Sequence, residues 1–544
     1  MNLKIYHMNL SVKSLFLTGL LLPLLIQSSI AQTILPASQS ISAKLLRDKI
    51  AGGWAGKIIG VTYGGPTEFK AQEKTYDEPI TWVPADVISS LEQDDLYVQL
   101  TFLMTMDQYG IEAPSKKFQE LFAKAGYELW HANVQARKNY FDSIFPPMSG
   151  HPKNNIHADD IDFQIEADYI GFMCPGMPQT SNRIADKIGH VMNYGDGVYG
   201  GVFLSALYSQ AYFENNIRTL VEKALQALPA KSEYAKIIHD VLVLHDHYPN
   251  DWRAAWTELE AKWGTEHICD AGTTSNIDAK FNGAFIVMGL LYGEGEPLKT
   301  MEIATRCGQD SDCNPSNVMA VLGVIKGFSG LPVDYQEEMR KMGDSLFIHT
   351  NYSFNKAVDQ TFKYAKELIV KNGGAITSKE IKIKTQVLKP LAYEASFPKL
   401  IYDKTVKVND QNGWTFKGNW AAFNKDNPKT KFSNHAGDEA RFDFDGTGVS
   451  LNGNWFKDCG QADIYIDGAF DRTIDTYFFF ANQTHNNMDL YHITNLKPGK
   501  HTLKVVVKGT KRAEATGENI YLTKAIVFKT GSKRSESFKF SFQK

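Results

Sequence analysis

Two short acidic motifs hold the residues best suited to chemistry. Asp94 and Asp95 stand directly before a run of apolar residues that is typical of a buried helix. Asp310 and Asp312 lie shortly before Pro315, which suits the first turn of a helix and leaves both acids in the preceding loop. Carboxylate oxygens are the ligands that Mg²⁺ and Ca²⁺ prefer, and the Asp-x-Asp spacing lets two side chains reach one cation. Helix capping and the helix dipole explain one acid in each motif but leave the other unexplained.

A third candidate, Glu68, follows a helix with an unusual glycine pattern. The glycines that recur at every fourth residue, on one side of this helix, are Gly52, Gly56, Gly60 and Gly64. Each costs roughly 1 kcal/mol relative to alanine, so we expect the stripe to pack closely against another helix. A Gly-Gly-Pro sequence then ends the helix, so that Glu68 lies in a loop. Glu68 is a candidate catalytic residue, and the alternative is that it is a solvated acid on the surface.

A fourth segment, residues 160–201, is rich in acids and glycines that allow close backbone approach to a ligand. We take Glu166, His190 and Asp196 from it as candidate substrate-binding residues. A structural role is the alternative for each of them, and for His190 it is the role of a core histidine whose ring nitrogens are already hydrogen-bonded.

The elements that must position these groups change character near residue 375. Before it, apolar residues recur at three- and four-residue spacing, which favours amphipathic helices. After it, apolar and polar residues alternate, as around Ile464 and Ile466, and Asp-Gly and Pro-Gly pairs mark turns. The sequence therefore predicts a multidomain chain, with an all-α domain over residues 40–375 and an all-β sandwich over residues 390–530.

The composition narrows the class of protein. The chain has 544 residues, 43% of them hydrophobic, which excludes a disordered or collagen-like protein. Its 58 basic and 61 acidic residues give a net charge of −3, so we expect no nucleic-acid partner. Five cysteines are too few for a disulfide scaffold. Pairing cannot be read from the sequence, and no metal-binding spacing is seen at Cys174, Cys269, Cys307 and Cys459.

The N-terminal residues predict an exported protein. Lys4 and Lys13 precede a short apolar stretch, which is followed by Ser-Ile-Ala, a small-residue motif that suits a cleavage site. This arrangement is typical of a secretory signal peptide, and the apolar run is too short to suit a membrane anchor. We therefore expect cleavage after Ala31, with residues 1–31 as the signal peptide, and a secreted or periplasmic protein without a membrane anchor.

The four segments together resemble the ADP-ribosylglycohydrolase family, which includes the dinitrogenase reductase-activating glycohydrolase. The family opens with a glycine-spaced helix that ends near a glutamate, which corresponds to Glu68. Its Thr-Asp-Asp motif at a helix start corresponds to Gln93, Asp94 and Asp95. Order and spacing agree over residues 45–335.

The second acidic motif also matches this family. A Gly-Asp-Thr-Asp-Thr sequence before a small-residue helix corresponds to Gln309, Asp310, Ser311, Asp312 and Cys313. His190 falls where the family often has a Thr-His pair between the two acidic motifs.

The resemblance implies an all-α fold with one or two Mg²⁺ ions, which grip sugar hydroxyls and orient attack at the anomeric carbon, and Ca²⁺ is an alternative ion. The metal ligands that it carries over are Asp94, Asp95, Asp310 and Asp312. The catalytic candidates are Glu68, as an acid or base beside the leaving group, and Asp95.

Two residues depart from the family pattern. Gln93 stands where the family prefers threonine or serine, and Cys313 stands where it prefers threonine. A thiol is a poor ligand for Mg²⁺, because hard cations take oxygen. The number of ions therefore stays open.

The predicted sandwich resembles the carbohydrate-binding modules of secreted glycosidases. Its aromatic residues that look exposed are Trp414, Trp420, Trp455 and Tyr477. Aromatic faces can stack on sugars, and a place in the sandwich core is the alternative.

The main hypothesis is a secreted, metal-dependent glycoside hydrolase that cleaves an N- or O-glycosidic bond of an ADP-ribosyl, ribosyl or related furanosyl substrate. Its partner would be a glycan, a nucleotide-sugar or a ribosylated molecule. One alternative is a metal-independent glycosidase that acts on polysaccharide through Glu68 and Glu166. The other is a catalytically silent protein that binds carbohydrate or nucleotide.

Overall fold

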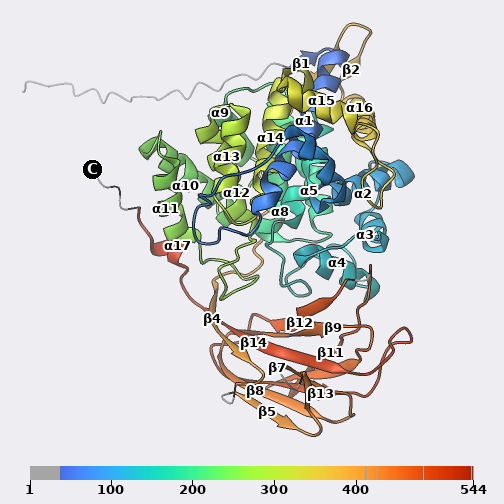
Figure 1. Cartoon of the computed structure of the whole chain (residues 1–544), viewed down its shortest axis with the longest axis vertical. Coiled ribbons are helices and arrows are strands. Elements are labelled where there is room, and N and C mark those ends of the chain that lie inside the picture. Colours follow the sequence, from blue (N-terminus) through green and yellow to red (C-terminus); the bar gives the residue numbers. More distant parts are fainter. Residues whose placement is uncertain (1–36, 411–412, 425–426, 482, 541, 543–544) are drawn as a thin grey trace, which may run out of the picture. The chain divides into compact units, whose positions relative to one another are not determined.

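The computed structural model describes residues 37–410, 413–424, 427–481, 483–540 and 542, and the expected signal peptide, residues 1–31, lies outside the described residues. The chain from Ala37 onward forms one compact unit, in which helices are followed by strands (Figure 1). Among the described residues, no helix combines the length and apolar character needed to cross a membrane.

The helical part confirms the expected all-α domain. Its helices are α1 (Ala43–Gly64), α2 (Asp94–Tyr109), α3 (Ser115–Lys124), α4 (His131–Phe141), α5 (Asp162–Glu166), α6 (Asp168–Phe172), α7 (Pro178–Gly189), α8 (Gly195–Ala211), α9 (Ile217–Leu225), α10 (Glu233–His247), α11 (Trp252–Trp263), α12 (Ala279–Gly293), α13 (Pro297–Arg306), α14 (Cys313–Lys326), α15 (Val333–Lys341) and α16 (Phe354–Lys371). All residues of α12 and nearly all of α8 are buried, because both helices are apolar on every face. These central helices place the remaining ones around the core.

The C-terminal part is a sandwich of two antiparallel sheets. Its strands are β4 (Leu400–Lys407), β5 (Trp414–Lys417), β6 (Ala421–Asn424), β7 (Asn427–Ser433), β8 (Glu439–Gly446), β9 (Gly448–Trp455), β10 (Gln461–Ile466), β11 (Ala469–Asp475), β12 (His485–Ile493), β13 (Gly499–Val507) and β14 (Ile520–Thr530), followed by a short helix, α17 (Arg534–Ser537). One sheet has the order β11-β10-β13-β8-β5 and the other β12-β9-β14-β7-β6, with β4 added beside β14. Alternate residues of β10 and β13 are buried, which is the expected period of two.

A small third sheet flanks the helical domain and was not expected from the sequence. It joins β1 (Ser38–Ile41), β2 (Ala375–Ile376) and β3 (Ile381–Lys384) in the order β1-β3-β2. The start of the described chain thus pairs with the segment that leads out of the last long helix.

The aromatic residues of the sandwich need a correction. Trp414 is 8% exposed and Trp455 is 2% exposed, so both belong to the hydrophobic core. Trp420 is half-buried and packs against the same core. Trp414 and Trp455 are therefore core residues, and they are not available to stack on sugars.

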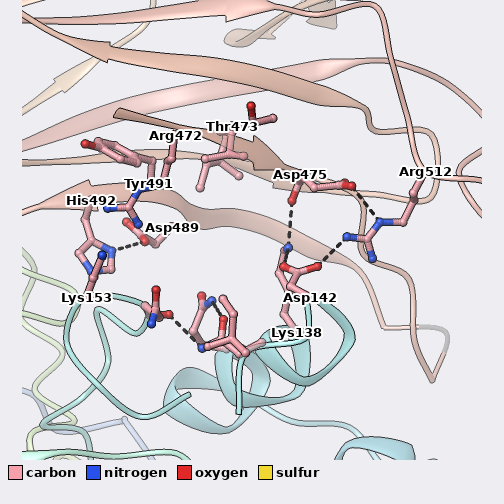
Figure 2. Close-up of a pocket in the computed structure, with 16 residues that line it drawn as sticks. Lys138, Asp142, Lys153, Arg472, Thr473, Asp475, Asp489, Tyr491, His492 and Arg512 are labelled. Atoms are coloured by element: carbon pink, nitrogen blue, oxygen red, sulfur yellow. Dashed lines mark hydrogen bonds and ion pairs between the residues drawn. The ribbon is translucent and has the colours of Figure 1, made fainter. Parts of the chain in front are cut away.

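Polar contacts tie α4 to the sandwich (Figure 2). Lys138 Nζ donates to the main-chain oxygen of Asp475 over 2.9 Å. Arg512 lies 2.6 Å from Asp142 and 2.9 Å from the Asp475 carboxylate. A cavity of about 340 Å³ lies between these groups, and the ion pairs that cross it hold α4 in place against β11.

The glycine stripe of α1 packs against the backbone of α14, as the spacing predicts. A Cβ at Gly56 would lie 2.2 Å from the main-chain oxygen of Met319, and one at Gly60 would lie 2.2 Å from that of Pro315. Gly52 and Gly64 make equally close approaches one turn further along in each direction. Only glycine permits this contact, because any Cβ would push the two helices apart.

We expect Gly56→Ala and Gly60→Ala each to lower the free energy of unfolding by about 1–3 kcal/mol, since overpacking outweighs the gain in helix propensity. Urea denaturation measures the change. Gly65→Ala is the matched control, because its backbone is helical and its nearest neighbour, a Gln93 side-chain nitrogen, is 3.9 Å from the added Cβ. Equal stabilities for the stripe variants and this control would contradict the packing argument.

Candidate functional site

The α1–α14 contact places the Glu68 loop beside the second acidic motif, and Asp94, at the start of α2, lines the same pocket. The pocket has a volume of about 410 Å³, and its lining includes Glu68, Asp94, Asp310 and Asp312. Gln93 and Cys313, the two departures from the family pattern, line it as well. Four of the residues selected from the sequence therefore line one pocket, although Glu68 and Asp94 are more than 200 positions away from Asp310 and Asp312 along the chain.

The second acidic motif forms the most buried part of this pocket. Asp312 caps α14 and accepts a hydrogen bond from the Cys313 main-chain nitrogen over 2.9 Å. The side chains of Asp310, Asp312 and Cys313 offer one donor atom each within 4.8 Å of one another. Asp310 Oδ1 is buried and has no hydrogen-bond partner among the described residues. A buried oxygen of this kind is costly unless a cation or a proton satisfies it.

The crowded acids hold protons more tightly than isolated ones would. Burial, aided by the charge of Asp95, raises the pKa of Asp94 to about 6. Burial raises the pKa of Asp310 to about 7, although a hydrogen bond with Asp312 opposes the shift. Partial burial at the pocket mouth, together with the charges of Asp312 and Asp94, raises the pKa of Glu68 to about 8. A nearby positive charge would therefore stabilise the ionised forms of these carboxyls.

The loop that carries Glu68 is joined to the loop that carries Asp310. The Phe69 main-chain nitrogen donates to the Gln309 oxygen over 3.0 Å, and the Gln309 nitrogen donates to the Ala71 oxygen over 2.8 Å. The hydroxyls of Thr67 and Ser311 are hydrogen-bonded at 2.8 Å. Glu68 itself is exposed in this loop, which places it at the mouth of the pocket.

Asp95 lies behind the pocket, in an ion-pair network that the sequence did not predict. Lys57 Nζ is 2.6 Å from Asp95 Oδ2 and 3.2 Å from Asp168 Oδ2, and all three side chains are fully buried. Burial opposes the charge of Lys57, but the carboxylates of Asp168 and Asp95 outweigh it and raise its pKa above the usual value. Lys57 thus stays charged and neutralises Asp95 from within.

The thiol of Cys313 is hydrogen-bonded to Asp95. Its Sγ donates to Asp95 Oδ1 over 2.9 Å, so the two oxygens of Asp95 are paired with Cys313 and Lys57. Burial and the nearby carboxylates, Asp310 first, raise the pKa of the thiol well above its usual value and keep it protonated. Cys313 acts here as a hydrogen-bond donor that orients a carboxylate.

The three candidate substrate-binding residues are not brought together. Glu166 is fully buried and accepts a hydrogen bond from Asn133. His190 is bound through its two ring nitrogens to the main-chain oxygen of Asp186 and to Glu394, at 2.6 and 3.0 Å. Asp196 accepts from the main chain at the start of α10. Neither His190 nor Asp196 lines the pocket, and the partners of both are those of structural side chains.

Several pocket residues were not selected from the sequence. Tyr97, Trp130 and His131 line it beside Asp162, whose carboxylate accepts hydrogen bonds from two main-chain nitrogens at the start of α4. Asp162 belongs to the acid-rich segment of residues 160–201, but no local pattern marks the aromatic residues. Tyr97 reaches the pocket from α2, and Trp130 and His131 reach it from the start of α4.

The Lys57 network predicts a large effect on stability. We expect Lys57→Met to lower the free energy of unfolding by about 3–5 kcal/mol, because it leaves buried carboxylates without a partner charge. Lys44→Met, on the exposed face of the same helix, is the control for losing a lysine. Urea denaturation of both variants gives the comparison, and a Lys57→Met protein as stable as the control would contradict the assigned ion pairs.

The chain is similar to several known proteins. A family model described as ADP-ribosylglycohydrolase matches residues 42–367, more than half of the chain. A chain of a solved "ADP-ribosylglycohydrolase-related protein complex" is 13% identical with a TM-score of 0.41, covering 59% of this chain and 99% of its own. The CBM36-1 domain of a multidomain xylanase from the hindgut metagenome of Trinervitermes trinervoides is 14% identical with a TM-score of 0.17, covering 24% of this chain and 98% of its own.

A curated relative matches a shorter stretch. The A type blood alpha-D-galactosamine galactosaminidase of Flavonifractor plautii is 30% identical over 118 residues, which is 21% of this chain and 10% of that protein. This chain thus spans about a tenth of the relative's length. The family match covers both acidic motifs and Glu68, so the chain belongs to the ADP-ribosylglycohydrolase family and carries the glycoside hydrolase fold of that family.

Proposed function

We propose that this protein is an exported, metal-dependent glycoside hydrolase that acts on a ribosyl or related furanosyl unit of a glycan or conjugate. The observation that carries the proposal is that Asp94, Asp310 and Asp312 line one pocket, where Asp310 Oδ1 is buried without a hydrogen-bond partner among the described residues. Export rests on the signal-peptide pattern of residues 1–31. Similarity to a galactosaminidase supports a glycan as substrate.

The donor groups of the pocket fit a hard divalent cation such as Mg²⁺ or Ca²⁺. Asp94, Asp310 and Asp312 would hold it, because all three line the pocket and burial among neighbouring carboxylates raises their pKa values. Asp95 would position the site, since its two oxygens are taken by Lys57 and the thiol of Cys313. When bound, the ion supplies the positive charge that orients sugar hydroxyls and polarises the reacting centre.

Glu68 is suited to the proton transfer at the glycosidic bond. Burial and the carboxylates of Asp312 and Asp94 raise the pKa of Glu68, which favours the protonated carboxyl that can donate a proton to a departing oxygen or nitrogen. Its exposure on the loop at the pocket mouth lets the leaving group stay in solvent. Glu166 fits this role poorly because it is fully buried and hydrogen-bonded to Asn133, which disfavours the metal-independent alternative.

A substrate screen with a metal-site variant tests the proposal. We expect the chain to hydrolyse members of a panel of ADP-ribosyl, nucleoside and aryl-furanoside substrates with Mg²⁺, and to lose this activity with EDTA. Asp310→Asn should lower kcat/KM by more than about 100-fold, since even outer-shell metal partners are worth 10–100-fold. Asp334→Asn, an exposed acid at the start of α15, is the control. Full activity of Asp310→Asn would contradict a role for the cluster.

The raised pKa values predict that ion binding depends on pH. Because Asp310 must lose its proton to act as a ligand, its pKa of about 7 means that affinity is low below that pH and rises through it. We expect the association constant for Mg²⁺ to increase about tenfold from pH 6 to pH 8, with protons released on binding. Calorimetric titration in buffers of different ionisation enthalpy measures both quantities. An affinity that stays constant over this range, without proton release, would be the contrary result.

A further inference from the structure

A second cluster of metal-binding side chains stands behind the wall of the candidate pocket. His131 begins α4, His157 and Asp160 lie in the loop before α5, and Cys269 lies in the loop between α11 and α12. One donor atom from each of the four side chains lies within 4.8 Å of the others. None of these residues belongs to the acidic motifs.

The distances between the donor atoms suit a single ion. His157 Nδ1 lies 2.9 Å from Asp160 Oδ2 and 2.9 Å from Cys269 Sγ. His131 Nδ1 lies 3.6 Å from both of these atoms. Ligand atoms of a tetrahedral zinc ion are about 3.3–3.7 Å apart, as follows from bond lengths of about 2.0–2.3 Å. The four atoms therefore need to move by only a few tenths of an ångström to surround Zn²⁺.

The chemistry of the donors selects the ion. Two imidazoles, a thiol and a carboxylate form the mixed nitrogen, sulfur and oxygen set that Zn²⁺ accepts, whereas Mg²⁺ and Ca²⁺ take oxygen. We infer that His131, His157, Asp160 and Cys269 bind one zinc ion, at a site separate from the acidic cluster. Four protein ligands leave no position for substrate, which is the arrangement of a structural zinc site.

Burial and charge support this assignment. The side chain of Asp160 is 3% exposed, and among the described residues its ion pairs are with His131 and His157 alone. Cys269 is 4% exposed, and its Sγ contacts the same two rings. The buried carboxylate of Asp160 thus faces two imidazoles and a thiol, with no lysine or arginine ion pair among the described residues, and a bound cation would stabilise it. The histidine rings are 27% and 15% exposed and leave a path for the ion.

The backbone around the cluster is already fixed for binding. His131 has a φ of 43°, a left-handed conformation that is costly for a residue other than glycine and that concentrates at functional sites. Asn193 Nδ2 donates to the main-chain oxygen of Asp160 over 2.8 Å, and His267 holds the main-chain oxygen of Cys269 at 2.7 Å. The ligands therefore stand on segments that hydrogen bonds hold in place.

Zinc at this position would order one wall of the candidate pocket. His131 lines that pocket, and it also lines a second cavity, of about 300 Å³, between the helical domain and the sandwich. Fixing its ring fixes the first turn of α4 and the neighbouring Trp130. The inference concerns a different ion and different residues from the proposed function, so either can fail without the other.

Metal analysis of the purified full chain tests the inference. After loading with Zn²⁺ and dialysis, we expect one zinc ion per chain, and we expect the Co²⁺-substituted protein to show the visible bands of a tetrahedral site together with a thiolate-to-cobalt charge-transfer band. These measurements use the unaltered protein, so they do not depend on how a variant folds. Folded protein that retains no zinc, or binds cobalt without a thiolate band, would overturn the inference.

Variants then locate the ion. Cys269→Ser and His157→Ala should each lose the bound zinc, whereas Cys307→Ser, a change at another buried cysteine of the helical domain, should retain it. Asp310→Asn should also retain it while losing Mg²⁺-dependent activity. Near-ultraviolet circular dichroism checks that each variant is folded. Zinc that remains in folded Cys269→Ser and His157→Ala, or that leaves only with Asp310→Asn, would place the ion elsewhere and refute the site.

Discussion

The backbone contact between α1 and α14 decides where the acidic groups of this protein stand. Because Gly52, Gly56 and Gly60 lie against main-chain oxygens of α14, and Gly64 lies against that of Ser311 just before it, the two helices have one register. That register sets the end of α1, and so the Glu68 loop, beside the start of α14, where Asp310 and Asp312 lie. A slide by one turn, about 5.4 Å, would move Glu68 away from Asp310 and Asp312. The glycines lower the intrinsic stability of the helix, but they allow the close packing that sets the position of the Glu68 loop.

Gathering several carboxylates in one buried place is electrostatically unfavourable, and two features of the structure reduce this cost. Behind the pocket, the ammonium group of Lys57 neutralises Asp95 and Asp168 inside the core. At the pocket surface no lysine or arginine ion pair reaches Asp94 or Asp310 among the described residues, and the pKa values of both rise instead. The inner acids are therefore neutralised within the core, and the outer acids are the ones that we propose as cation ligands.

Sequence patterns predicted the features that depend on local spacing. The glycine stripe, the Glu68 loop, the two acidic motifs and the change from helical to strand periodicity near residue 375 are all visible within short windows. Features that depend on tertiary contacts were missed or misplaced. Lys57 reads as one lysine in an apolar helix, and only the fold shows that it faces two carboxylates. Trp455 looked like a surface residue because alternation alone does not say which face of a strand is covered. The ligands around Cys269 come from three distant segments, so no spacing could reveal them.

The central claim is that the carboxylates of Asp94, Asp310 and Asp312, which line one pocket, bind a divalent cation. Anomalous X-ray scattering from crystals soaked in Mn²⁺, a stand-in for Mg²⁺ that prefers the same oxygen ligands, tests it most directly. The account predicts an anomalous peak between Asp94, Asp310 and Asp312, with Asp95 still paired to Lys57. Crystals at saturating Mn²⁺ with no peak among these three carboxylates, or with the ion bound on Asp95 in place of Lys57, would contradict it.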